Sequence, residues 1–353
     1  MRDKEVDPAS FARPTSVDPA AILTVVRVPH EWERWRVDRV VHATFSRMSR
    51  TRAQGVVRAG AYAADGRRLR PNDRVRAGDV VLLYRPPFDE PEVPLDCPVL
   101  YEDAALLAID KPSGLPVHPT ARYHHHTVTA RLALLRPGDF LALCHRIDRE
   151  TSGVLLLAKD LESERFIKRV LEQKSGVSGV SGAAAAVSKR YLCITWGVPE
   201  PRFGRIAHAL KLDERNRFRV KMRTCEGDEP DALAAATRYE VLAVRAHPTD
   251  EMRTYALVAC DLETGRQHQI RAHLAAISTP IVGDKLYGPD DEIFGRGADD
   301  ELTEEDRRAL ELPRHALHAH RLSVPHPHSP HAQTLIESPL PADLRAFWDG
   351  LRG

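Results

Sequence analysis

One short segment sets a carboxylate among arginines in a way that could support chemistry. HRIDRETSG, at 145–153, places Asp148 between Arg146 and Arg149, just ahead of an apolar run. A nearby positive charge favours the ionised form of a carboxylate. Asp148 could therefore be a nucleophile, a base or half of a structural ion pair. Taken alone, the segment favours the structural ion pair.

A second segment, KRYLCITWG at 189–197, places Tyr191 after a basic pair at the start of a strand-like run. A tyrosine in this position is usually half-buried packing. Its functional alternative is a ring that stacks on a base while the hydroxyl handles a proton. The segment by itself leaves both interpretations open.

The third segment, TGRQHQIRAHLAAI at 264–277, is the densest in polar groups. Arg266, His268 and Arg271 crowd into the start of a predicted helix after a Thr-Gly turn. Planar side chains with several donors suit the recognition of phosphate and carboxylate. The same alternation is equally typical of one solvated face of an element.

The elements that must position these residues mix strands and helices. The segments 99–112 and 153–160 are predicted to be buried strands, and 162–174 has the apolar period of a helix. The segment 175–188 is so rich in glycine, serine and alanine that we expect a flexible insertion. The acidic segment 289–310 is predicted to form a solvent-facing loop and helix rather than a site.

The charge of the chain is concentrated near its N-terminus. The whole chain has a net charge of +1, but 31–85 contains thirteen arginines, no lysine and six acidic residues, a net charge of +7. Apolar spacing predicts a helix within 32–45 and a second helix that ends at Gly60 as its C-cap. Two short strands follow, with an Asp-Gly turn at 65–66.

This N-terminal pattern resembles a small RNA-binding module first seen in a ribosomal protein of the small subunit. The resemblance lies in SRMSRTRAQGVVRAGAYAADGRRLRPNDRVRAGDVVLL, at 46–83. It implies that the arginines of the second helix contact RNA, and the residues we select are Arg50, Arg52 and Arg58. The alternative is a solvated basic face without a ligand.

Several classes of protein are excluded by composition. No apolar run approaches the roughly 20 residues that span a bilayer, and the N-terminus lacks the apolar core of a signal peptide. Five scattered cysteines without CxxC spacing indicate neither a disulfide framework nor a cysteine zinc site. The histidine-rich tracts 124–126 and 318–331 lack a clear acidic or cysteine partner, so we expect no metal. The cytoplasm is the expected compartment.

Together the three segments resemble the RluA-type family of RNA pseudouridine synthases. DKPSGLPVHPT at 110–120 lies upstream and HALHAHRLSVPHP at 315–327 lies downstream, in the family's order. The resemblance covers about Val99 to Leu351. It implies an α+β fold with a mixed, largely antiparallel sheet flanked by helices, and an RNA cleft across the middle of the sheet. The implied reaction converts uridine in RNA to pseudouridine, with no cofactor and no metal.

The resemblance also implies catalytic roles. Asp148 matches the family's catalytic aspartate, which attacks either the ribose or the uracil ring. Arg271 matches the arginine that pairs with this aspartate and keeps it ionised. Tyr191 matches the tyrosine that stacks on uracil and assists removal of the carbon-5 proton. Arg149 has no assigned role.

Further residues are expected to contact the RNA. Arg146 resembles the side chain that fills the space left when the target base flips out of its stack. Arg266 and His268 are expected to bind RNA, and Leu317 or His318 to line the far side of the uracil pocket.

The expected organisation has four parts. These are a flexible arm at 1–20, a small basic RNA-binding domain at 21–90, a linker at 91–98 and a catalytic domain at 99–353. We expect a monomer that acts on ribosomal or transfer RNA and not on a membrane. A catalytically silent RNA-binding or assembly protein on the same scaffold is the main alternative. Hydrolysis of a nucleoside or glycoside is a weaker one, because it usually needs two carboxylates and only one is presented.

Overall fold

The chain divides into two compact units, Met1–Asp89 and Glu90–Gly353. The structure, a computed structural model, describes residues 11–45, 49–86, 90–120, 122–174, 187–298 and 300–353. Half of the expected arm, 1–10, and most of the expected insertion, 175–186, lie outside the described residues. Each unit is described by itself.

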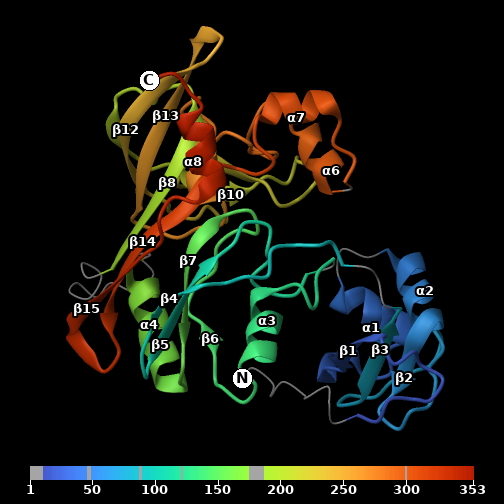
Figure 1. Ribbon diagram of the computed structural model, residues 1–353. Helices are drawn as coiled ribbons and strands as arrows, with labels where there is room; N and C mark the ends of the chain where they lie inside the picture. Colours follow the sequence, from blue (N-terminus) through green and yellow to red (C-terminus); the bar gives the residue numbers. More distant parts are fainter. Residues whose placement is uncertain (1–10, 46–48, 87–89, 121, 175–186, 299) are drawn as a thin grey trace. The chain divides into compact units, whose positions relative to one another are not determined.

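The first unit packs two helices on a small antiparallel sheet of order β1-β3-β2 (Figure 1). Both predicted helices and both predicted strands are present, and β1 is an addition that the sequence pattern did not predict. A valine-rich core joins the helices to the sheet. In chain order the elements are β1 (Ile22–Arg27), a 3-10 helix (His30–Trp32), α1 (Val37–Thr44), α2 (Arg50–Gly60), β2 (Ala61–Ala63) and β3 (Val80–Arg85).

Gly60 does not cap α2 in the way the sequence predicted. It is the last helical residue, and the C-cap is Ala61 in an extended conformation. A Cβ at Gly60 would lie 2.1 Å from the carbonyl oxygen of Tyr84. The prediction of a C-cap is therefore wrong, and the glycine is required because β3 approaches the end of α2 closely.

The second unit is built on a mixed sheet in which ten strands are described, with β4-β5-β7-β14-β8-β13-β12-β9 as the main path. β15 pairs with β14, and β6 pairs with β7. Among the described strands only β7 and β14 pair in parallel, so the predicted α+β class with a mixed, largely antiparallel sheet is confirmed. The strands are β4 (Val99–Glu102), β5 (Leu106–Lys111), β6 (Ala142–Leu143), β7 (Ser152–Ala158), β8 (Ser188–Trp196), β9 (Phe203–Ile206), β12 (Thr237–His247), β13 (Asp250–Leu262), β14 (Leu317–His326) and β15 (Ser329–Glu337).

Strand β7 is buried on both faces, as its continuous apolar sequence predicted. Val154 and Leu156 pack with α4 (Leu161–Lys174) through residues such as Ile167. Leu155 and Leu157, which point to the opposite face, pack with α3 (Val128–Leu135). Helices on both sides therefore fix the strand that follows the Asp148 loop.

The remaining elements surround the other half of the sheet (Figure 1). The acidic segment 289–310 contributes two helices, and each buries an apolar residue, Ile293 in one and Leu310 in the other. No helix in the described part of the chain is long and apolar enough to cross a membrane. These elements are β10 (Ala209–Leu212), β11 (Met222–Cys225), α5 (Gln269–Ala276), α6 (Glu292–Ala298), α7 (Glu304–Leu310) and α8 (Ala342–Asp349).

Gly153 makes the parallel junction between β7 and β14 possible. It pairs with Ala319 and has a φ of +108°, a conformation that side chains rarely adopt. A Cβ at this position would lie 2.3 Å from the carbonyl oxygen of Ala319. The glycine of the Thr-Ser-Gly sequence thus brings the Asp148 loop against β14.

Candidate active site

Asp148 lies on a loop between β6 and β7 whose backbone is held by the segment 110–120. The buried ammonium of Lys111 donates to the carbonyl oxygens of Arg149, Leu115 and Pro112, at 2.9, 2.9 and 2.7 Å. The amide of Gly114 also donates to the Arg149 carbonyl, at 2.9 Å. These bonds satisfy carbonyls that the loop would otherwise leave unpaired.

The other side of the loop is held by side chains from distant segments. His315 Nε2 lies 2.9 Å from the hydroxyl of Thr151. Lys285 Nζ lies 3.0 and 3.1 Å from the carboxylate oxygens of Glu150. Burial lowers the pKa of His315 to about 3, and the nearby Arg271 charge acts in the same direction. His315 is therefore neutral at neutral pH and acts as a hydrogen-bonding partner of the loop.

Arg271 on α5 bonds two carboxylates, that of Asp148 on the loop and that of Asp284 in the segment after α5. Its Nη1 donates to Asp148 Oδ2 at 3.0 Å, across 123 residues of sequence. Its Nε and Nη2 donate to the two oxygens of Asp284, at 2.7 and 2.8 Å. The structure thus brings together the aspartate and the arginine that the sequence singled out.

Asp284 is the residue that our sequence interpretation missed. It is fully buried, and besides the guanidinium it accepts the backbone amides of Leu286 and Tyr287, at 2.9 and 3.0 Å. Its pKa lies well below the ordinary value because the attraction of Arg271 outweighs the effect of burial. A carboxylate so close to an arginine-rich segment was the available signal.

The side chain of Asp148 is 27% exposed, so it is accessible from solvent as well as anchored. Burial alone would raise the pKa of Asp148, but the guanidinium of Arg271, which bonds the carboxylate, lowers it below the ordinary value. Asp148 is therefore an anion at neutral pH, as a nucleophile must be.

Tyr191 lies two strands from the loop. On β8 it pairs with Ala319 of β14, and Ala319 pairs in turn with Gly153 at the start of β7. The ring is 9% exposed. Burial and the negative charge of Asp148 both raise the pKa of Tyr191. The phenol of Tyr191 therefore stays protonated at neutral pH. It lies close enough to Asp148 for the charge of that carboxylate to affect it.

His268 immediately precedes α5 and faces the same carboxylate. Its Nε2 lies 3.9 Å from Asp148 Oδ2, and its Nδ1 lies 3.2 Å from the hydroxyl of Tyr287. Burial and the Arg271 charge lower the pKa of His268 to about 4. Arg266 lies two residues earlier, and its Nε donates to the carbonyl oxygen of Ala234 at 3.0 Å.

The two arginines that flank Asp148 have different surroundings. Arg146 is exposed, and within the described ranges its side chain makes no hydrogen bond or ion pair. Arg149 donates to the hydroxyl of Tyr123 at 2.9 Å and pairs with Glu150 at 3.1 Å. Arg149 therefore supports the loop, while Arg146 is available to an external ligand.

The sequence expectation for His318 is wrong. The ring is fully buried; its Nδ1 lies 3.0 Å from Ser152 Oγ, and its Nε2 lies 3.1 Å from the carbonyl oxygen of Ser338. Both nitrogens are thus engaged within the fold. Leu317 is also buried and belongs to the same apolar cluster as Tyr191.

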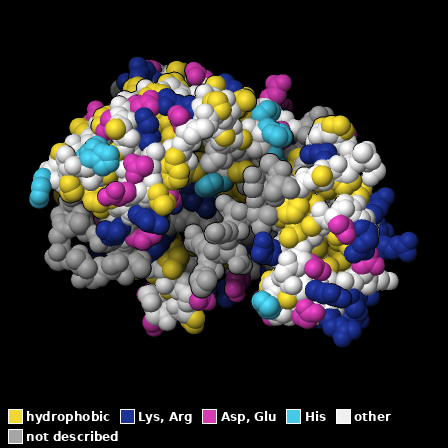
Figure 2. Space-filling model, turned by 90° about the horizontal axis from the view of Figure 1, so that it is seen from below, with side chains coloured by type: hydrophobic (Ala, Val, Ile, Leu, Met, Phe, Trp, Pro, Cys, Tyr) yellow, Lys and Arg dark blue, Asp and Glu magenta, His cyan; other side chains and the backbone are white. Residues whose placement is uncertain are grey.

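The arginines selected in the first unit lie on α2, and all three are exposed. Asp38 of α1 is buried, and its carboxylate accepts hydrogen bonds from the side chains of Arg36 and Gln54. Arg50 Nε lies 3.9 Å from Oδ2 of the same carboxylate. No partner is recorded for the side chain of Arg52 within the described ranges. The remaining member, Arg58, reaches only Gln54, at 3.5 Å. Figure 2 shows dark blue side chains gathered over this unit, at the right of the view.

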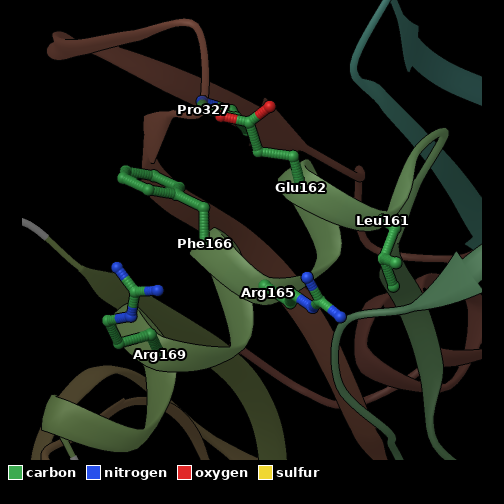
Figure 3. A pocket seen from close by; sticks show the side chains of 6 residues that line it. All are labelled: Leu161, Glu162, Arg165, Phe166, Arg169 and Pro327. Carbon is green, nitrogen blue, oxygen red and sulfur yellow. The ribbon is translucent and has the colours of Figure 1, made fainter.

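Two grooves of about 530 Å³ each lie outside the Asp148 loop. One follows α4 and carries Arg165, Phe166 and Arg169 (Figure 3). The other borders Arg266 and has a floor of small residues, chiefly the alanines of the segment 232–236.

Metal ligation has no support in the described part of the chain, where no group of three His, Cys, Asp or Glu residues is arranged to hold an ion. In the histidine-rich tract, His326 instead bonds Asp103 at 2.7 Å. His126 Nδ1 lies 2.9 Å from the carbonyl oxygen of Pro91.

Sequence comparison finds relatives over nearly the whole chain. A family described as RNA pseudouridylate synthase matches residues 105–276. Ribosomal large subunit pseudouridine synthase D of Xanthomonas campestris pv. campestris is 34% identical over 335 residues, 92% of this chain and 91% of that protein. The protein of the same name from Pseudomonas aeruginosa is 31% identical, over 92% of this chain and 94% of its own length.

Structural comparison finds the same type of protein. Human RNA pseudouridylate synthase domain containing 4 superposes with a TM-score of 0.52 at 26% identity, over 72% of this chain and 94% of that one. Human RNA pseudouridylate synthase domain containing 1 superposes with a TM-score of 0.53 at 23% identity, over 71% of this chain and 86% of that one. The second likeness supports the fold only.

Proposed function

The chain belongs to the RluA-type family of RNA pseudouridine synthases and isomerises uridine in RNA to pseudouridine, and we propose that Asp148, Arg271 and Tyr191 carry out this reaction. The observation that carries the proposal is the Asp148 carboxylate, partly exposed and bonded by Arg271 at 3.0 Å. A carboxylate that is both anionic and accessible is suited to attack a carbon of the nucleotide.

Each of the three residues has a separate task. Asp148 acts as the nucleophile, on either the ribose or the uracil ring. Arg271 keeps Asp148 ionised and aimed, because its own position is fixed by the buried Asp284. Tyr191 supplies a ring for stacking on uracil and assists removal of the carbon-5 proton. Its raised pKa means that it enters the reaction as a neutral phenol.

The RNA is held by positively charged side chains near the site. Arg146 is exposed two residues before the nucleophile, where it can occupy the space of a flipped base. Arg266 borders the alanine-lined groove, and we propose that flanking nucleotides pass there. We propose that the exposed α2 residues of the first unit, Arg50, Arg52 and Arg58, also bind RNA.

Ribosomal RNA is the substrate that we favour over transfer RNA. Two relatives with more than 30% identity over nine tenths of this chain are named as synthases of the large ribosomal subunit. We further propose that the protein acts as a monomer in the cytoplasm. Sedimentation of the purified protein tests the oligomeric state, and mapping of pseudouridines in a strain that lacks the gene tests the RNA substrate.

Tritium release tests the catalytic assignment directly. RNA that contains uridine labelled with tritium at carbon 5 is incubated with the protein, and released tritium is counted. We expect release from the wild type and none from Asp148→Asn, while RNA affinity stays unchanged.

A matched control uses a carboxylate outside the site. Asp349 on α8 contacts Arg245 at 3.4 Å, so Asp349→Asn removes a comparable charge from the surface. It should release tritium like the wild type. Binding of cellular RNA without any release would instead identify a catalytically silent RNA-binding protein.

A further inference from the structure

Both recorded contacts of the Asp148 carboxylate go to the same oxygen. Arg271 Nη1 lies 3.0 Å from Oδ2, and His268 Nε2 lies 3.9 Å from Oδ2. Within the described ranges no hydrogen bond reaches Oδ1. The carboxylate is therefore held from one side, and its two oxygens differ in their surroundings.

The hydrogen-bond partners of Tyr287 determine which nitrogen of His268 carries the proton. The amide of Met222 donates to the Tyr287 oxygen at 2.7 Å. The phenol hydrogen then needs an acceptor, because the ring is buried and an unpaired hydroxyl is costly. His268 Nδ1 lies 3.2 Å from the Tyr287 oxygen, and we take it as that acceptor. With Nδ1 as the acceptor, the neutral ring carries its hydrogen on Nε2, which faces Asp148.

The backbone supports this orientation of the ring. His268 is the N-cap of α5 and has a left-handed conformation, with a φ of 55°. Residues other than glycine adopt this conformation at a cost of roughly 1 kcal/mol or more, and such positions cluster at functional sites. Its carbonyl nevertheless accepts the amide of Ala272 at 2.9 Å, so the helix still begins normally.

We propose that His268 is a positioning residue that, together with Arg271, holds Oδ2 of Asp148 and leaves Oδ1 to face the substrate. This inference rests on the proposed function, in which Asp148 is the nucleophile. It differs from the RNA-binding role that the sequence led us to expect for His268, because Nε2 lies 3.9 Å from the enzyme's own carboxylate, a separation that substrate binding can shorten to a hydrogen bond. Tyr287 contributes indirectly by fixing the tautomer.

A neutral donor suits this task better than a second cation. Burial lowers the pKa of His268, and the charges of Arg271 and Arg146 lower it further. The carboxylates of Asp148 and Asp284 raise this pKa, but by less, so the net shift is downward. His268 therefore remains neutral across the range in which the enzyme works. It orients the carboxylate without adding a charge that would reduce its nucleophilicity.

Single-turnover tritium release with three variants tests the proposal. Asparagine tolerates the left-handed conformation but has no donor at the Nε2 position, so His268→Asn should lower the rate about a hundredfold, as for a misaligned reacting group. RNA affinity should stay within about twofold of wild type. The amide nitrogen of glutamine reaches the Nε2 position, so His268→Gln should recover part of the rate. Tyr287→Phe should lower the rate less than His268→Asn.

Controls separate positioning from other roles. His331→Asn, at an exposed histidine of β15, should match the wild type. A rate for His268→Asn equal to wild type would overturn the proposal. So would a loss of RNA affinity as large as the loss of rate, which would restore the RNA-binding role. A rate inflection near the ordinary histidine pKa that disappears in His268→Asn would indicate acid–base catalysis instead.

The tautomer can be measured without activity. Nitrogen-15 spectra of histidine-labelled wild type should show an unprotonated Nδ1 and a protonated Nε2 for His268, assigned by comparison with His268→Asn. A protonated Nδ1 would refute the proposal even in an active enzyme. An inactive wild type with the expected tautomer would point to failure of the proposed function and not of this hydrogen-bond arrangement.

Discussion

Removal of the Asp284 carboxylate should cost both stability and activity. Asp284 accepts two bonds from Arg271, at 2.7 and 2.8 Å, and two backbone amides, at 2.9 and 3.0 Å. Both side chains of the pair are buried, with 7% and 0% exposure. Asp284→Ala leaves the Arg271 cation buried with Asp148 as its remaining carboxylate partner. Breaking one side of a buried pair costs about 3–5 kcal/mol.

The loss should be visible in unfolding and in catalysis. In a unit of this size, about 4 kcal/mol corresponds to a fall in Tm of roughly 10 °C. Urea unfolding followed by tryptophan fluorescence gives the free energy, and tritium release gives the rate. Arg271 without Asp284 is free to change its position, so we expect the rate to fall even at temperatures where Asp284→Ala is fully folded. Added salt should restore neither quantity, because the pair is shielded from solvent.

An exposed pair of similar geometry provides the comparison. Arg205 contacts Glu263 at 2.9–3.1 Å, but its side chain is 53% exposed. Arg205→Ala should therefore change the free energy of unfolding by less than about 1 kcal/mol. Equal losses for Arg205→Ala and Asp284→Ala would refute the reasoning, as would full activity in Asp284→Ala.

Three other outcomes are expected. Lys111→Met would leave the carbonyl oxygens of Pro112 and Leu115 without their donor and Arg149 with the Gly114 amide alone, so urea unfolding should show a loss of about 3 kcal/mol and tritium release should slow. Unchanged stability would show that water replaces the ammonium. Replacement of Arg50, Arg52 and Arg58 together by glutamine should weaken RNA binding. In filter-binding assays the slope of log affinity against log salt should fall in magnitude by about 2–3. An unchanged slope would exclude α2 from the RNA interface. Because the folded-state pKa of Asp148 lies below its ordinary value of 3.8, the stability from its pairing is present above the unfolded-state pKa and lost as the pH falls through the folded pKa. The rate should therefore show no loss from protonation of Asp148 between about pH 8 and pH 5, and a fall within that range, in buffers where unfolding is absent, would contradict the lowered pKa.

The sequence predicted the parts of the site that depend on local pattern. The apolar run after Gly153 predicted β7 because strands covered on both faces need no polar alternation. Asp148 and Arg271 could be paired before the structure was known because their segments resemble a family in which these positions meet. The separation of Asp148 and Arg271 in the sequence does not by itself reveal that they pair.

The supporting interactions could not be predicted because they join distant segments. Asp284 lies 13 residues after Arg271, beyond the helix; its closeness to arginines in the sequence indicates a candidate charge partner but not that the carboxylate is buried. His318 was misassigned because burial depends on how β14 pairs with β7 and β8. Gly60 was misassigned because a close approach of β3 and a left-handed cap both require glycine. Local patterns identify the element, but tertiary contacts decide what each residue does in it.

The parallel junction of β7 and β14 also has a consequence for synthesis. Ser152 and His318 are 166 residues apart, so the nucleophile loop cannot reach its final geometry until β14 has emerged and joined the sheet. The strands of the arginine-rich first unit are complete at Arg85. A growing chain therefore carries its positively charged unit well before its reactive carboxylate is aimed. During translation the arginine-rich unit can therefore bind RNA before the catalytic site can modify it.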